Sequence, residues 1–256
     1  MMRKIIIMFL TFFSLFALTA CKKRIEINGE KNFYYHRYVE KTATAIDDIY
    51  IPIIVQKEIK EIDLIEINFS TNSEAKLELE GFKLIDEYKK YYLYQVKSKL
   101  SEVSNSIVIE NMKFKVNNEE IINYKPVRFA VVKARYEEID HDIFKLFSKY
   151  LVYNEVENPI TYMIEKIDEV DIKDIITTEK IISTTYGEQN TISGYLPTIT
   201  VHTEDVGIAY PAASVIYNME FVLEYNGEEY SYTKNIMSYV GNFRGLLEQI
   251  LNEESK

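Results

Sequence analysis

The side chains that most often do chemistry in proteins are few and scattered in this chain. They are three histidines, His36, His141 and His202, and a single cysteine, Cys21. Only His141 has carboxylates beside it, in the triplet Asp140-His141-Asp142. The triplet fits a metal or acid–base site, but it also fits the solvated start of a helix, where aspartate caps the backbone and interacts favourably with the dipole. We favour the second interpretation and predict no catalytic residue and no metal site.

Compact functional motifs are missing from the sequence. It contains no phosphate-cradling glycine loop, no dinucleotide fingerprint, no zinc spacing and no serine-nucleophile elbow. The acidic run Asp168, Glu169, Asp171 and Asp174 is interleaved with apolar residues and lacks the glycine turn of a calcium loop. It fits the solvated face of a strand or helix. The sequence therefore predicts neither an enzyme nor a cofactor.

Cys21 is the residue with the clearest chemical expectation. A basic pair, Arg3-Lys4, precedes an apolar run from Ile5 to Ala17, and the small residue Ala20 stands directly before Cys21. This is the three-part layout of a secretory signal, and the run is shorter than the roughly 20 residues needed to cross a bilayer. The tetrapeptide Leu18-Thr19-Ala20-Cys21 resembles a bacterial lipobox.

The lipobox resemblance implies both a location and an anchor. In such proteins the signal is cut between the residues at positions 20 and 21, and the cysteine sulfur, here that of Cys21, carries diacylglycerol. Two acyl chains hold a protein firmly on a membrane, whereas one chain binds it only marginally. The alternative is an uncleaved N-terminal anchor. The resemblance covers residues 1 to 21 only, and we recognise no family in the remainder.

Composition limits the partners of the remaining chain. Residues 1–20 hold two bases and no acids, so residues 21–256 carry 28 Lys and Arg against 40 Asp and Glu, a formal charge of −12. Nucleic acid is therefore an unfavourable partner, since its binding requires a basic surface. The membrane, reached through the lipid, and an unidentified envelope protein are the partners that we expect.

The hydrophobic pattern is mostly that of β-strands. Segments 76–80 and 112–116 alternate strictly between apolar and polar residues, and Asn226-Gly227 is a strong hairpin signal. Pro52 indicates an edge or bulged strand, and a phase switch between Leu64 and Ile65 suggests a bulge. Two segments instead have helical spacing: Ile143, Phe144, Leu146, Phe147, Tyr150 and Leu151, and later Phe243, Leu246, Leu247, Ile250 and Leu251.

We therefore predict a mainly β fold of two tandem Ig-like β-sandwich modules with one helix after each. The predicted division is a signal peptide (1–20), a tether (21–33), an N-terminal β-sandwich (34–135), a helical connector (136–158) and a C-terminal β-rich domain with a terminal helix (159–256). Segment 111–121 resembles segment 218–230, with Asn-Met-x-Phe before a turn in both. A tandem duplication would explain this resemblance, and coincidence between two hairpin endings is the alternative.

Tyrosine is abundant in this chain, with 21 residues, and tryptophan is absent. Tyr88, Tyr91, Tyr92, Tyr94 and Tyr210 are our candidate interaction surface, because tyrosine is enriched in interfaces. Aromatic pairing within the sheet is the alternative. The leading functional hypothesis is a non-catalytic binding, adaptor or accessory protein at the cell envelope. A solute- or glycan-binding receptor and an envelope-modifying enzyme are the alternatives.

Overall fold

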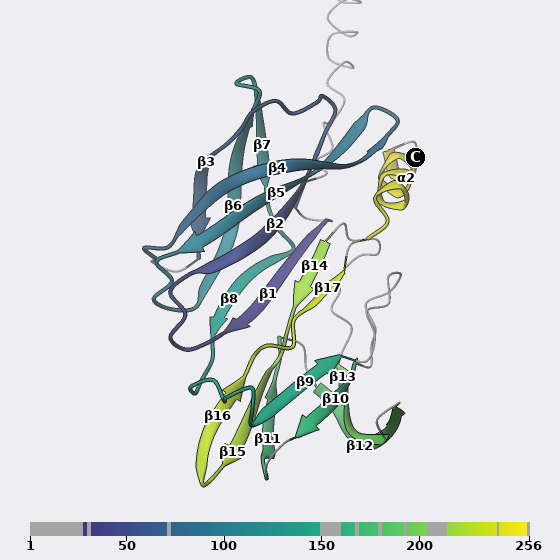
Figure 1. Cartoon of the computed structure of the whole chain (residues 1–256). Coiled ribbons are helices and arrows are strands. Elements are labelled where there is room, and N and C mark those ends of the chain that lie inside the picture. The colour runs from purple at the N-terminus through teal and green to yellow at the C-terminus, as the bar shows by residue number, and fades with distance from the viewer. Residues whose placement is uncertain are drawn as a thin grey trace, which may run out of the picture.

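We analysed a computed structural model of the 256-residue chain (Figure 1). The structure describes residues 28–29, 32–70, 73–148, 160–166, 169–178, 181–191, 194–203, 214–239 and 241–254. The predicted signal peptide and most of the tether lie outside these ranges. So do residues 149–158 and Tyr210.

The first module is a sandwich of two sheets. One sheet has the order β2-β5-β4, and the other contains β1, β8, β6 and β3, with β7 paired to β6. The strands are β1 Phe33–Val39, β2 Ile46–Val55, β3 Ile62–Phe69, β4 Lys76–Tyr88, β5 Tyr91–Ser101, β6 Ile107–Val116, β7 Glu120–Tyr124 and β8 Arg128–Lys133. Alternate residues of the two sheets meet in one apolar core, with Phe33, Ile51, Val96 and Phe114 fully buried.

The second module is built in the same way. A sheet of order β12-β13-β10-β9 faces a sheet of order β11-β15-β16 across a second core that contains Tyr162, Ile199 and Phe221. Its strands are β9 Phe144–Ser148, β10 Ile160–Lys166, β11 Asp171–Ile176, β12 Ile181–Thr191, β13 Gly194–Thr203, β14 Ser214–Tyr217, β15 Glu220–Tyr225, β16 Glu228–Tyr232 and β17 Met237–Tyr239.

The strand order of both modules is that of an immunoglobulin fold. If β9 to β13 are named A to E, β15 is F and β16 is G, the sheets read A-B-E-D and C-F-G, as in constant-type domains. The first module repeats this order, with β2, β5 and β4 as B, E and D. Its first strand differs, because β1 pairs in parallel with β8 of the opposite sheet. The prediction of two Ig-like sandwich modules is confirmed.

The two modules share a sheet. In the second module the F and G strands are each divided, into β14 and β15 and into β16 and β17. The β14–β17 pair leaves its own sandwich, and β14 lies parallel to β1 from Phe33↔Ser214 to His36↔Tyr217. The result is a seven-stranded sheet that crosses the module boundary (Figure 1).

Two asparagine side chains replace the backbone ladder where these strands divide. Asn218 Oδ1 accepts the Tyr38 N–H at 2.6 Å, and its Nδ2 donates to the carbonyls of Tyr38 (2.9 Å) and Thr233 (2.6 Å). Asn235 pairs with the Met219 backbone in both directions, at 2.9 Å each. Both asparagines are buried, so these bonds satisfy backbone groups that would otherwise be desolvated without partners.

The connector between the modules is extended rather than helical. Glu138 bridges in parallel to Ser231 of β16, and its two carboxylate oxygens accept the N–H and hydroxyl of Thr233 at 2.9 Å. Buried Glu220 accepts the Arg135 N–H at 2.7 Å and the Ser231 hydroxyl at 2.6 Å. Residues 135–139 of the connector are thus hydrogen-bonded to the second module.

The predicted helical connector is therefore wrong over residues 136–148, and residues 149–158 lie outside the described part of the chain. Asp140 does cap a turn, since its Oδ1 accepts the Asp142 N–H at 2.9 Å, but the chain then enters strand β9. Phe144 and Leu146 are both buried and Lys145 between them is exposed. A short apolar pattern of this kind fits the two-residue period of a strand as well as one stripe of a helix. Hydrogen bonding to β10 is what makes this segment a strand.

The terminal helix is confirmed as α2, Phe243–Glu254. It returns from the second module to the outer face of the β2-β5-β4 sheet, near the tip of the β4–β5 hairpin (Figure 1). There Phe243, Leu246, Leu247 and Ile250 pack against Ile54, Tyr91 and Leu93. The helix is therefore a second attachment between the modules.

Several local predictions are also confirmed. β3 has a register shift after Leu64, β2 containing Pro52 pairs only with β5 among the described strands, and Asn226-Gly227 has positive φ at both residues. The two segments with similar sequences form equivalent hairpins, β6–β7 and β15–β16. The similarity of the two helical patterns does not extend to structure, since one is β9 and the other α2.

We predict that Asn218→Ala lowers the free energy of unfolding by about 3 kcal/mol, because it removes three hydrogen bonds and leaves buried backbone groups unpaired. Urea denaturation followed by circular dichroism measures the change. The control is Asn123→Ala on the exposed side of β7, for which we expect a change within about 0.5 kcal/mol. Equal losses for the two variants would contradict this role for Asn218.

Candidate functional site

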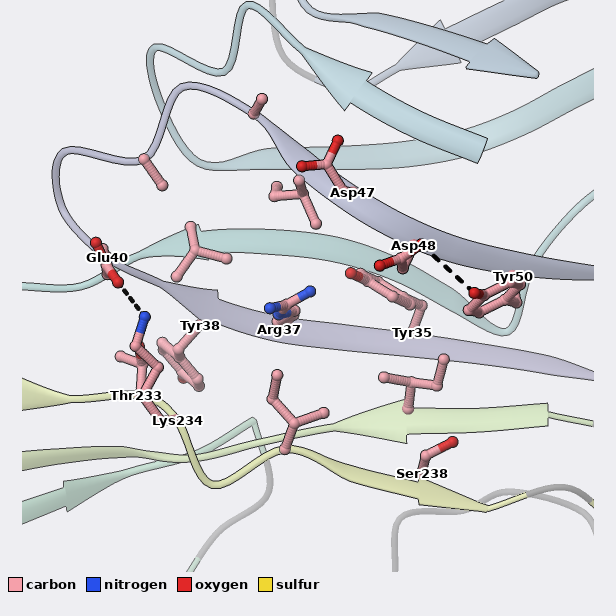
Figure 2. Close-up of a pocket in the computed structure, with 16 residues that line it drawn as sticks. Tyr35, Arg37, Tyr38, Glu40, Asp47, Asp48, Tyr50, Thr233, Lys234 and Ser238 are labelled. Carbon is pink, nitrogen blue, oxygen red and sulfur yellow. Dashed lines mark hydrogen bonds and ion pairs between the residues drawn. The ribbon is translucent and has the colours of Figure 1, made fainter. Parts of the chain in front are cut away.

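A groove lies where the shared sheet extends past the edge of the smaller sheet that covers it. The β2-β5-β4 sheet ends at β2, whereas the sheet beneath it continues from β1 to β14 and β17. The uncovered strip is a half-open cavity of about 610 Å³, which we call the junction groove (Figure 2). Its volume is in the range of small-molecule sites.

The floor of the junction groove comes from the facing side chains of three strands. Tyr35 and Arg37 of β1, Ile216 of β14 and Ser238 of β17 share one face, because β1 and β14 pair Tyr35 with Ile216, and β17 pairs Ser238 with Ile216. Burial raises the pKa of the Tyr35 hydroxyl, and the Arg37 guanidinium beside it acts in the opposite direction. The floor thus combines a buried aromatic ring, Tyr35, with a partly exposed cation, Arg37, and a partly exposed aliphatic side chain, Ile216.

A β-bulge forms the wall opposite the floor. The β2–β5 register shifts between Ile46 and Ile49, and Asp48 within the shift has a φ of 57°. Bulges commonly redirect side chains in this way, and here Asp47, Asp48 and Tyr50 border the groove (Figure 2).

The acidic groups of the groove are already paired. Asp47 lies 2.9 Å from Lys99 and Asp48 lies 3.0 Å from Lys97, both lysines on β5. The hydrogen bond and charge of Lys97 lower the pKa of Asp48. At the far end Glu40 forms an ion pair with Lys234 (Figure 2).

Arg37 is the cation of the groove that has no ion-pair partner among the described residues, and its charge acts on Asp48 and on the Tyr35 hydroxyl. The residue is half-buried on the floor of the groove. A guanidinium presents a planar fork of donors that matches a carboxylate or phosphate. The junction groove can therefore hold an anionic group at Arg37 with apolar or aromatic groups beside it.

The backbone edge of β2 above the groove is partly protected. Ile54 exchanges hydrogen bonds with the side-chain amide of Asn28, at 2.7 and 2.9 Å. Pro52 has no N–H to offer, and its carbonyl accepts the Tyr124 hydroxyl at 2.9 Å. These contacts close the end of β2 that lies away from the groove and leave the Asp48–Tyr50 end facing it.

The three histidines lie in different elements: His36 in β1, His141 in the turn before β9 and His202 in β13. No group of three His, Cys, Asp or Glu residues in the described part of the chain could hold a metal ion. His36 is buried, and Arg128 Nε donates to its Nδ1 at 2.9 Å. His141 packs beside the Tyr232 ring.

Four tyrosines of the predicted interaction surface take part in internal packing. Tyr91 and Tyr94 are buried, with hydroxyls that bond Gln56 at 3.1 Å and the Ile59 N–H at 3.0 Å. Tyr92 is half-buried against the first core. The Tyr88 hydroxyl donates to Glu248 of α2 at 2.6 Å. The fifth, Tyr210, lies outside the described residues.

Sequence analysis did not identify Arg37 or its neighbours. A usable signal was present: Phe33, Tyr35 and Val39 are the inward-facing residues of β1, and Arg37 occupies the same phase. A charged residue on the inward face of a strand requires a special environment. The other side of the groove, Lys234 and Ser238, gives no local signal because it follows from the pairing of β14 with β1.

Cys21 and Ala20 lie outside the described residues. Within the described ranges, no helix has both the length and the apolar character needed to span a bilayer. Lipidation and signal cleavage therefore remain predictions.

Comparisons with known proteins are weak. No family model and no curated protein matches the chain. The cadherin-like domains 1 to 4 of zebrafish RET match at 9% identity and a TM-score of 0.25, over 84% of this chain and 52% of that chain. The N-terminal periplasmic domain of ScsB from Proteus mirabilis matches at 14% identity and a TM-score of 0.21, over 76% and 89%. This chain thus spans about half of the RET structure. We assign the Ig-like fold from the strand order described above.

We predict that His36 makes stability depend on pH in mild acid. Burial, followed by the charge of Arg128, lowers the His36 pKa from 6.5 to about 3. Between these values the unfolded chain binds a proton that the folded chain does not, so stability falls as pH falls. For this one group the loss is about 2 kcal/mol between pH 6.5 and 4.5.

The comparison of wild type with His36→Gln by urea denaturation isolates this contribution. We expect a flatter pH dependence for the variant, because glutamine keeps an acceptor for Arg128 and does not titrate. Glu138, whose pKa is raised by burial, has the opposite pH dependence in both proteins and cancels in the difference. Parallel curves would show that His36 does not titrate in this way.

Proposed function

We propose that this chain is a lipid-anchored, extracytoplasmic protein that acts without catalysis as a binding or adaptor subunit at the cell envelope. The junction groove would hold a segment of an envelope partner. The leader and Cys21 support the location, and the shared sheet of the two modules supports a groove at their junction.

The observation that carries this proposal is Arg37 on the floor of the junction groove. The neighbouring carboxylates Asp47 and Asp48 have lysine partners. Asp48, whose pKa is lowered by Lys97 and also by the charge of Arg37, is the only one of the two that a bound anionic group would compete with for Arg37. Tyr50 and Ile216 offer adjoining, partly exposed apolar surface. A carboxylate of a partner segment, with an apolar side chain next to it, would match this arrangement.

The alternative is a receptor for a small solute or glycan. The groove volume of about 610 Å³ favours it, and tyrosine rings can stack on sugars. Among the described residues, no specific group supports an envelope-modifying enzyme. A partner protein and a small ligand are distinguished by what is captured at the groove.

Site-specific photo-crosslinking in cells tests the proposal. A photoreactive residue in place of Ser238 should capture one reproducible protein, and one in place of exposed Lys83 on β4 should not. Arg37→Gln should reduce the Ser238 capture by about tenfold, the effect of losing one charge-assisted contact, and Arg37→Lys should reduce it less. Equal capture at both positions, or capture unaffected by Arg37→Gln, would contradict a role for the groove.

The same cells test the anchor separately. The Cys21→Ala variant has no thiol to acylate, so it should carry no lipid and retain its signal peptide. The cleaved, acylated membrane form of the protein should therefore disappear. Metabolic labelling with a fatty acid and fractionation measure this. Unchanged cleavage and membrane recovery in the variant would indicate an anchor other than the Cys21 lipid and would leave the groove proposal standing.

A further inference from the structure

Strand β12 has one backbone edge with which no described strand pairs. Within the described part of the chain it pairs only with β13, and the register is unbroken from Ser183↔His202 to Thr191↔Gly194. Its single register shift lies at the start, between Ile181 and Ser183. We propose that this edge is a self-association surface, on which β12 pairs antiparallel with β12 of a second copy about a two-fold axis. The proposal does not depend on the junction groove.

The other sheet edges among the described residues carry features that prevent such pairing. β3 and β4 each have two register shifts, and β4 is rich in charged residues. β11 combines a register shift with Asp171, Lys173 and Asp174. β2 has Pro52 and the Asn28 contact, and β7, β9, β16 and β17 are at most five residues long. Proteins protect exposed edges by these means.

β12 lacks these protective features after its first residues. It is 11 residues long, contains no proline or lysine, and has Glu188 as its only charged residue. Residues 182–188 are exposed, and Ile182 and Tyr186 are each 65% accessible. Isoleucine, threonine and tyrosine favour strand pairing. A second strand on this edge would pair the open backbone groups and cover these side chains together.

The low charge of this edge suits a second copy of this chain as the source of the second strand. The chain has a net charge of −10, so two copies repel one another across most approaches. β12 and β13 together contain one carboxylate, Glu188, and form a nearly neutral strip. A two-fold antiparallel pairing also needs no second complementary surface, because each edge supplies the same groups.

Cysteine cross-linking in intact cells tests the pairing directly. Cys21 is the only cysteine, so single cysteines introduced at positions 183 to 188 report on β12, and the unsubstituted chain controls for bonds through Cys21. Near a two-fold axis a residue lies opposite its own copy, about 4.5–5.5 Å away between Cα atoms, within disulfide reach. We expect homodimers that peak at one or two neighbouring positions. A cysteine at Lys83 on β4 should give none.

Sedimentation of the full chain in detergent provides an independent measurement. Thr185→Lys combined with Tyr186→Lys places like charges across the axis and should raise the dimer dissociation constant by about tenfold or more. Leu84→Lys on exposed β4 is the matched control and should leave it unchanged. A chain that stays monomeric, a flat cross-linking profile, or cross-links from β12 to a different protein would each overturn the proposal.

Discussion

The parallel pairing of β1 with β14 is the interaction on which the rest of this structure depends. Only four residues of each strand pair, yet they join the two sandwiches into one sheet, beside the extended connector and the packing of α2. The pairing obliges the F and G strands of the second module to divide. The buried side chains of Asn218 and Asn235 compensate for this division. They hydrogen-bond to the backbone N–H and C=O groups that lose their strand partners where the ladder is interrupted.

The junction groove is a consequence of the same pairing. Adding β14 and β17 widens one sheet of the first module without widening the sheet that faces it. The inward face of β1 is therefore covered at Phe33 and open at Arg37. A charged side chain is tolerated there because it stays in contact with solvent. The same strand thus contributes Phe33 to the core and Arg37 to the groove. Helix α2, which packs on the outer face of the smaller sheet, covers Tyr88 and Tyr91 of the β4–β5 hairpin and leaves the groove open.

Sequence patterns predicted the elements whose structure is decided locally. The strict alternation in β4 and β6, the Asn226-Gly227 turn, the bulge in β3 and the apolar stripe of α2 all follow from neighbours in the chain. The segment beginning at Ile143 was predicted wrongly because a short apolar pattern satisfies both periods, and its pairing with β10 decides the outcome. The groove could not be predicted, since Arg37 and Ser238 come from opposite ends of the sequence and meet only through β14.

Native-state hydrogen exchange tests most directly whether the two modules form one cooperative unit. Amides at the centre of each core, such as Val96 in β5 and Leu223 in β15, report on their own modules. If the β1–β14 pairing and α2 bind the modules together, both sets should open with the same free energy and the same dependence on urea. Exchange in the second module at a lower free energy, while the first stays protected, would contradict this account.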